Sequence, residues 1–150
     1  MDHVTQQLKL FPEIAVAIAH RLSSDVLWQL YDQTKEEIQH GTFTRLPEMH
    51  ALSCALKVLG SSDSSTGIER LRLACGGHGY MSAASLGDLY GAATAACTYE
   101  GENTVLLLQV GRFLMKSWQQ ALKGKELVPT VAYLSEAVKQ KQFGVWSGSW

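Results

Sequence analysis

The stretch TYEGENTVLLLQ, residues 98–109, joins a glycine-flanked acidic pair to a run of apolar residues. Glycine, glutamate and asparagine together favour a loop, whereas the run VLLL at 105–108 indicates a buried helix. Glu100 therefore stands at a buried junction where a loop becomes a helix. Two interpretations are open: its carboxylate caps the helix, stabilised by the free N–H groups and the dipole, or it is a general base that faces a cleft.

A second candidate is CGGHGY, residues 75–80. Glycines after a helix let backbone N–H groups approach a ligand closely, most often a phosphate. The cluster follows no strand and lacks the Lys-Ser/Thr of a P-loop, so neither nucleotide-binding fingerprint applies. A turn that caps the helix C-terminus is the other interpretation. His78 could be a base, a phosphate donor or a surface residue.

The charge balance excludes several classes of partner. Lys and Arg number 13 against 14 Asp and Glu, which leaves a net charge of −1 and gives no reason to expect nucleic acid or an anionic membrane. The apolar runs are far shorter than the ~20 residues of a membrane span. We find no signal peptide and no Ser-Lys-Leu address at the C-terminus.

The three cysteines, Cys54, Cys75 and Cys97, are scattered and contain no CxxC. This odd, dispersed set predicts buried free thiols in a reducing compartment. No Cys/His pair has the spacing of metal ligands, so we expect no metal site.

Apolar residues at spacings of three and four predict a helix over residues 12–40 with one buried stripe. Pro12 fits its first position, residues 5–10 could add a further turn, and Gly41 ends it. A second helix is predicted from Pro47 to about Cys75. Its octad GSSDSSTG, residues 60–67, is either a break or a small-residue stretch that lets another helix approach closely, and we favour the latter.

The cluster GGHG ends the second helix, because no helix tolerates three glycines in four residues. Residues 81–94 are predicted to form a compact loop with a short helix around 86–92. The third helix, about 101–122, is apolar nearly all round and is predicted to be central. Gly124 caps it, and a shorter helix covers 128–142. No strand pattern is present, so the fold class is all-α, an antiparallel helical bundle.

Two longer motifs, LRLACGGHGY at 71–80 and ACTYEGENTVLLLQVGRFLMKS at 96–117, closely resemble the peroxisomal acyl-CoA oxidase family, within the acyl-CoA dehydrogenase-like superfamily. The resemblance also covers TQQLKLFP at 5–12 and LPEMHALSCALK at 46–57, and so nearly the whole chain. The dehydrogenase branch usually reads YEGT-x-Q where this chain has YEGENT, which favours the oxidase.

The resemblance implies that residues 1–123 are the first C-terminal helical domain of such an oxidase and residues 124–150 the start of the last. The family oxidises a fatty acyl-CoA to the trans-2-enoyl-CoA with FAD and O2, giving H2O2, in the first step of peroxisomal fatty acid β-oxidation. A homodimer and a peroxisomal location are likewise implied. Without the family's N-terminal helical and β domains, this chain alone is expected to be inactive. An acyl-CoA dehydrogenase and a non-catalytic helical dimerisation module remain alternatives.

The resemblance also implies roles for individual residues. Glu100 matches the catalytic base. The residues that match the stretch along the adenosine-diphosphate part of FAD, commonly across a dimer interface, are Gly76, Gly77, His78 and Gly79. Those that match residues beside the flavin are Gly101, Glu102 and Asn103. Gln6 and Gln7 fall in a segment that in relatives lies near FAD or the partner subunit.

Overall fold

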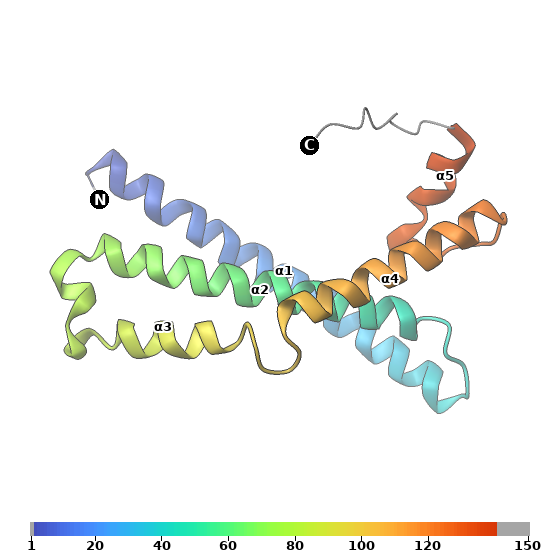
Figure 1. Ribbon diagram of the computed structural model, residues 1–150, viewed down its shortest axis with the longest axis horizontal. Helices are drawn as coiled ribbons and strands as arrows, with labels where there is room; N and C mark the ends of the chain where they lie inside the picture. The colour runs from blue at the N-terminus through green and yellow to red at the C-terminus, as the bar shows by residue number, and fades with distance from the viewer. Residues whose placement is uncertain (1, 141–150) are drawn as a thin grey trace.

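The computed structural model describes residues 2–140, which fold into helices (Figure 1). The α-helices are α1 (Val4–Gln39), α2 (Leu46–Ala74), α3 (Leu86–Ala95), α4 (Asn103–Leu122) and α5 (Tyr133–Gln140). Short 3₁₀ helices, η1 (Gly76–Tyr80), η2 (Ser82–Ala84) and η3 (Pro129–Val131), lie in the connections. Residues 2–140 contain no strand, so the all-α prediction is confirmed.

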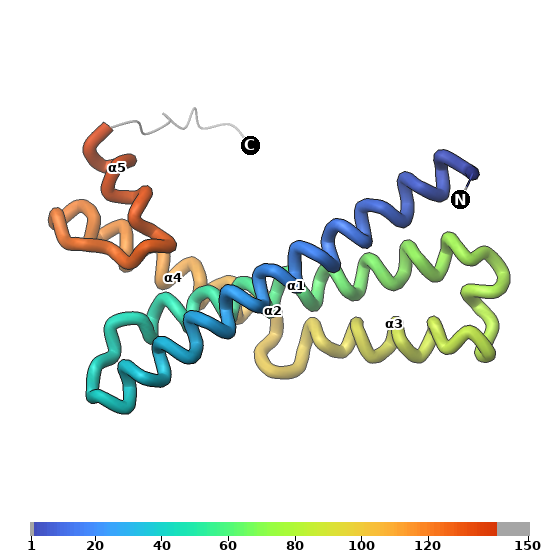
Figure 2. Tube along the Cα trace, turned by 180° about the vertical axis from the view of Figure 1, so that it is seen from behind, coloured from blue at the N-terminus to red at the C-terminus, as the bar shows by residue number. Residues whose placement is uncertain are grey.

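Helix α2 is the centre of the bundle, in contact with α1, α3 and α4. All three run antiparallel to it, with α3 along its C-terminal half and α4 along its N-terminal half (Figures 1 and 2). The antiparallel bundle is therefore confirmed, but the prediction that the third helix is central is wrong. Small side chains on α2 let neighbours approach, and Ala51, Cys54 and Ser61 are buried. On α4, Val105 and Leu108 are more than half exposed.

Helix α1 begins earlier and is less buried than its pattern predicts. It starts at Val4 and continues through Pro12, which is an interior residue and not the first. A proline removes one backbone hydrogen bond from a helix, and here both Pro12 and Leu8, whose carbonyl would have accepted it, are exposed to solvent. The apolar stripe was predicted to be buried, yet Ile14, Ile18 and Leu22 are more than half exposed, and among the described helices α1 packs mainly against α2.

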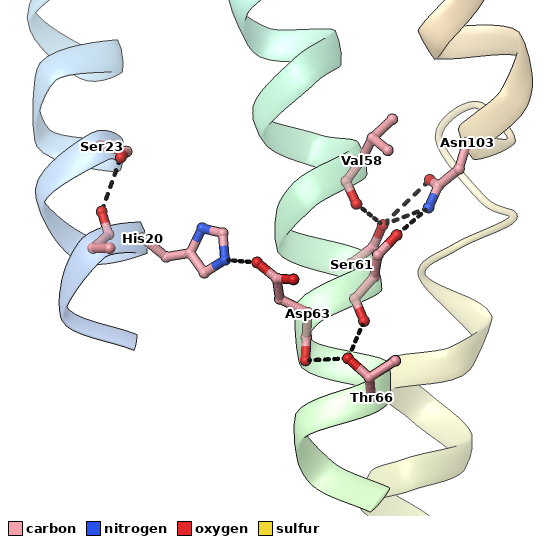
Figure 3. A network of polar contacts seen from close by, with 9 residues as sticks. His20, Ser23, Val58, Ser61, Asp63, Thr66 and Asn103 are labelled. Atoms are coloured by element: carbon pink, nitrogen blue, oxygen red, sulfur yellow. Dashed lines mark hydrogen bonds and ion pairs between the residues drawn. The ribbon is translucent and has the colours of Figure 1, made fainter. Parts of the chain in front are cut away.

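The octad at 60–67 is a continuous part of α2, as favoured from the sequence. Ser61 and Gly67 are buried there, and a Cβ at residue 67 would lie 2.5 Å from Glu13 Oε2 of α1. Across the same interface, His20 Nε2 of α1 lies 2.8 Å from Asp63 Oδ2 of α2 (Figure 3). Small and polar residues thus bring α1 and α2 together.

The glycines predicted to follow helix ends do so: Gly41 has φ +77° and Gly124 has φ +65°. The last helix, predicted over 128–142, starts only at Tyr133, and residues 141 and 142 lie outside the described residues. Before it, η3 is held to α2 by buried Glu48, which accepts hydrogen bonds from the backbone N–H of Thr130 at 2.9 Å and from its hydroxyl. This tie ends the loop that follows α4.

All three cysteines are free, but only Cys54 is buried as predicted. Cys97 is half-buried and Cys75 is exposed, because the latter sits at the end of α2, where the glycine-rich turn begins. Over residues 2–140, none of the helices has both the length and the apolar character needed to cross a membrane.

Candidate active site

The turn between α3 and α4, residues 96–102, carries Glu100 on an unusual backbone. The N–H of Asn103 donates to the carbonyl of Cys97 at 3.2 Å and closes the turn. Glu100 (φ +57°) and Gly101 (φ +102°) are consecutive residues with positive φ. For a residue with a Cβ such a conformation costs about 1–2 kcal/mol, so the contacts around Glu100 must impose it.

Gly101 could not be replaced easily. A Cβ at this position would lie 2.7 Å from Cδ2 of Leu106, one turn into α4. Glycine is favoured here chiefly by the positive φ, and it also leaves room for the Leu106 side chain.

The N-cap of α4 is Glu102 and not Glu100. Its carboxylate accepts hydrogen bonds from the backbone N–H groups of Thr104 at 3.0 Å and Val105 at 3.3 Å, and from the Thr104 hydroxyl at 3.1 Å. These bonds, the one from the Thr104 N–H foremost, hold the pKa of Glu102 below its ordinary value, with a smaller contribution from the nearby charge of Lys57. The capping role considered for Glu100 thus belongs to its neighbour, and α4 begins at Asn103 rather than Gly101.

Glu100 itself is exposed, so the prediction of a buried junction is wrong. Its carboxylate forms no hydrogen bond or ion pair within residues 2–140. Only Leu106 of the run VLLL is half-buried, and the rest of that run faces away from the bundle. The Glu100 carboxylate thus has no hydrogen-bond partner in the described chain, although its backbone is constrained. Such a carboxylate is free to accept a proton from a ligand.

The turn is tied to the middle of α2 by side chains that the sequence analysis missed. Lys57 Nζ donates to the Gly101 carbonyl oxygen at 2.6 Å and to Asn103 Oδ1 at 2.8 Å. Asn103 Nδ2 donates to the hydroxyls of Ser61 at 3.0 Å and Ser62 at 3.1 Å, and Figure 3 shows Ser61 facing Asn103 across the interface. A signal was present: Lys57 is a lone cation in the apolar run CALKVLG, and Ser61 lies one helical turn further on the same face.

The glycine-rich stretch ends α2 as predicted and forms η1. Gly76 has φ +58°, and a Cβ at Gly76 or Gly77 would meet nothing within 4 Å. Gly79 is the opposite case, because a Cβ there would lie 2.0 Å from the carbonyl oxygen of Arg72. His78 is exposed. The stretch therefore combines one buried glycine that fixes the turn with open backbone on its outer side.

The structure does not bring the two motifs together within one chain. η1 lies at one end of α3 and the Glu100 turn at the other (Figure 1), and ten helical residues span about 15 Å. Gln6, in contrast, does lie beside the glycine-rich stretch: its Nε2 is 3.4 Å from the carbonyl oxygen of Ala74. Gly101, Glu102 and Asn103 adjoin Glu100.

Among the described residues, no three His, Cys, Asp or Glu side chains are grouped so that they could hold a metal ion.

Comparison with known proteins places this turn in a family. The family model described as "Acyl-CoA oxidase, C-alpha1 domain" matches residues 1–115. The chain belongs to the acyl-CoA oxidase family. Its relatives include Acyl-coenzyme A oxidase 1 of Drosophila melanogaster, 54% identical over 149 residues, which are 99% of this chain and 22% of that protein. Peroxisomal acyl-coenzyme A oxidase 1 of Homo sapiens is 43% identical over 150 residues, 97% of this chain and 23% of that protein.

Solved acyl-CoA oxidases share the fold. A crystal structure of the tomato (Lycopersicon esculentum) enzyme is 41% identical with a TM-score of 0.87, over 99% of this chain and 23% of that one. Acyl-CoA oxidase-1 of Caenorhabditis elegans, complexed with FAD and ATP, is 41% identical with a TM-score of 0.84, over 88% of this chain and 20% of that one. The acyl-CoA oxidase chain described here thus spans about a fifth of these relatives' length. The matches favour the oxidase over the dehydrogenase branch.

Proposed function

We propose that this chain is the C-terminal, base-bearing helical segment of an FAD-dependent acyl-CoA oxidase, with Glu100 as the general base. The observation that supports the proposal is the difference between the two carboxylates of the turn. Glu102 caps α4, whereas the Glu100 carboxylate has no partner within residues 2–140 and sits on a backbone held from both sides. We also propose the division into a first C-terminal helical domain, 1–123, and the start of the last, 124–150.

The reaction asks for a firmly placed carboxylate. The α-proton of a fatty acyl thioester is a weak acid, so a base must be positioned against the α-carbon to remove it. Glu100 accepts that proton, and the electron pair of the broken α-C–H bond forms the α,β double bond as the β-hydrogen leaves as hydride. FAD, when bound, would supply the hydride acceptor, and its reoxidation by O2 would yield H2O2. Fatty acyl-CoA and O2 are the proposed reactants.

The residues proposed to hold FAD fit the group in part through their backbone. Gly76 and Gly77 leave room for close approach, and the first N–H groups of a helical turn have no partner within that turn. We place Gly76, Gly77, His78 and Gly79 along the adenosine-diphosphate part. Their position at the far end of α3 from Glu100 supports a homodimer in which a second copy supplies this stretch to the site.

Gly101, Glu102 and Asn103 are proposed to lie beside the flavin. The side chains of Glu102 and Asn103 are already engaged by α4 and α2, so their contribution is to fix the shape of the turn that the flavin would meet. Mammalian relatives are named peroxisomal, and we propose the same compartment for the oxidase that contains this chain.

The test compares Glu100→Gln with Glu36→Gln, which removes an exposed carboxylate near the end of α1, in the flavin-loaded oxidase that contains this segment. We expect Glu100→Gln to keep its flavin but to lose about 10²–10⁴-fold in acyl-CoA-dependent H2O2 formation, the usual contribution of a general base. Glu36→Gln should retain the parent rate.

Two outcomes would overturn the proposal. Parent-level turnover in Glu100→Gln would remove the base assignment. A colourless oligomer that neither takes up FAD nor consumes O2 with acyl-CoA would instead support the non-catalytic dimerisation module.

A further inference from the structure

The hydrogen bond that closes the Glu100 turn, from the Asn103 N–H to the Cys97 carbonyl, does not engage Glu100 or Gly101, the two residues with the strained backbone. Glu100 and Gly101 both have positive φ, and glutamate, unlike asparagine or aspartate, is not among the residues that adopt this conformation readily. The closing bond from Asn103 to Cys97 and the cap of Glu102 lie on either side of the turn. The carbonyl of Gly101, the residue after Glu100, is held by another helix.

Lys57 supplies that hold from α2. Its Nζ lies 2.6 Å from the Gly101 carbonyl oxygen, 44 residues along the chain, and 2.8 Å from Asn103 Oδ1. The side chain is half-buried, and a hydrogen bond from an ammonium group is stronger than one between neutral groups. One cation thus fixes two acceptors that follow Glu100 at one and three positions.

The hydrogen bonds of Asn103 fix the orientation of its side-chain amide. An ammonium group only donates, so the amide oxygen of Asn103 must face Lys57 and its Nδ2 must face Ser61 and Ser62. The Ser61 hydroxyl also lies 3.2 Å from the carbonyl oxygen of Val58 in its own helix and 3.2 Å from Asn103 Oδ1, and either oxygen can accept its proton (Figure 3). These hydrogen bonds fix Asn103, the first residue of α4, against one turn of α2. We therefore expect contacts with α2, as well as α4, to set the orientation of the Glu100 side chain.

We propose that Lys57 is a positioning residue for the base: it holds the Gly101 carbonyl and the Asn103 side chain so that the Glu100 carboxylate keeps its direction toward the α-carbon. The proposal rests on the proposed function of Glu100. Lys57 acts through the Gly101 peptide and Asn103, and no hydrogen bond or ion pair joins it to the Glu100 carboxylate in the described chain. Its loss should therefore slow proton removal without abolishing it.

The experiment uses the flavin-loaded oxidase that contains this segment and the variants Lys57→Met, Lys57→Arg and, as matched control, Lys116→Met. Lys116 is an exposed lysine of α4 without an ion pair among the described residues. Flavin reduction by acyl-CoA is followed without O2, with normal and α-dideuterated substrate. We expect Lys57→Met to reduce flavin about 10- to 100-fold more slowly, as displacement of a catalytic group by about 1 Å does, with substrate affinity and flavin content unchanged.

The isotope effect separates positioning from a general loss of structure. Slower α-proton removal should raise the deuterium isotope effect in Lys57→Met. Lys57→Arg keeps the charge but not the compact ammonium geometry, and should fall between the parent and Lys57→Met.

A Lys57→Met enzyme with the rate and isotope effect of Lys116→Met would overturn the proposal. If Lys57→Met does not retain flavin, Lys57→Arg decides, and parent-level values there would overturn it too. Glu100→Gln is measured alongside: an active Glu100→Gln enzyme removes the proposed function itself, whereas an inactive one beside an unaffected Lys57→Met removes only the role of Lys57.

Discussion

Glu100 and Glu102, two residues apart at the start of α4, have opposite surroundings. The Glu102 carboxylate accepts three hydrogen bonds from Thr104 and Val105, and the Glu100 carboxylate accepts none within residues 2–140. Glu100 and Gly101, both with positive φ, precede the cap, and only the Glu102 carboxylate meets the free N–H groups of the helix. One acidic residue therefore stabilises the fold and leaves the other for chemistry.

The cap makes a prediction about pH. Because hydrogen bonds from Thr104 and Val105 lower the pKa of folded Glu102 below its unfolded value near 4.5, its charge stabilises the fold above that pH. This contribution should disappear as the pH falls from about 4.5 through the lower folded pKa. We expect the wild-type chain to exceed Glu102→Gln in stability at pH 7 and to lose that advantage progressively as the pH is lowered below about 4.5, measured by urea unfolding.

The other carboxylates are the same in both proteins, so the difference between wild type and Glu102→Gln isolates the cap. A difference that stays constant from pH 7 to pH 3 would show that the charge of Glu102 contributes nothing to the helix start.

The helices themselves could be predicted from the sequence because their signals are local. The stop after α2 follows from the glycines at 76–79, and the helical octad at 60–67 follows from small residues that suit close packing. The boundaries that failed depend on context. Pro12 was predicted as a start and is interior to α1, because an exposed proline interrupts only one backbone hydrogen bond.

Burial could not be predicted, because apolar spacing shows which face of a helix is apolar but not what covers it. Ile18 of α1 and Leu108 of α4 lie on strongly apolar faces, yet both are more than half exposed. The centre is α2, whose buried residues, apart from Val58, are small or polar. At the site, the base role of Glu100 stays a prediction from the family resemblance, and the structure shows its side chain exposed rather than at a buried junction. Lys57 stands out as a lone cation in its apolar run, but its contact with Gly101 could not be predicted, because it joins residues 44 positions apart.

The glycine-rich turn offers a sharper test of packing. A Cβ at Gly79 would lie 2.0 Å from the Arg72 carbonyl oxygen, a backbone atom of α2 that cannot move aside cheaply. Gly79→Ala should therefore destabilise the chain by about 1–3 kcal/mol, the usual cost of overpacking. Gly77→Ala is the matched control, because its Cβ meets nothing within 4 Å, and it should stay within about 0.5 kcal/mol of wild type. Unfolding followed by circular dichroism measures both, and equal stabilities for the two variants would contradict the steric reason for Gly79.

The two glycines of the α2 octad should respond in opposite ways to the same substitution. Gly60 has open space around its Cβ position, so Gly60→Ala should stabilise the chain by about 0.5–1 kcal/mol through helix propensity alone. At Gly67 the new methyl group would lie 2.5 Å from Glu13 Oε2. Glu13 would have to turn away from Arg70, to which it is paired at 3.0 Å.

Gly67→Ala should therefore gain nothing or lose up to about 1 kcal/mol, because the propensity gain is offset by the disturbed ion pair. Adding Glu13→Ala removes the obstructing carboxylate, and Gly67→Ala in that background should recover the stabilisation seen at Gly60. Urea unfolding of the four proteins in this double-mutant cycle gives the coupling energy directly. Independent, additive effects of Gly67→Ala and Glu13→Ala would show that α1 does not approach α2 at Gly67 as closely as this packing requires.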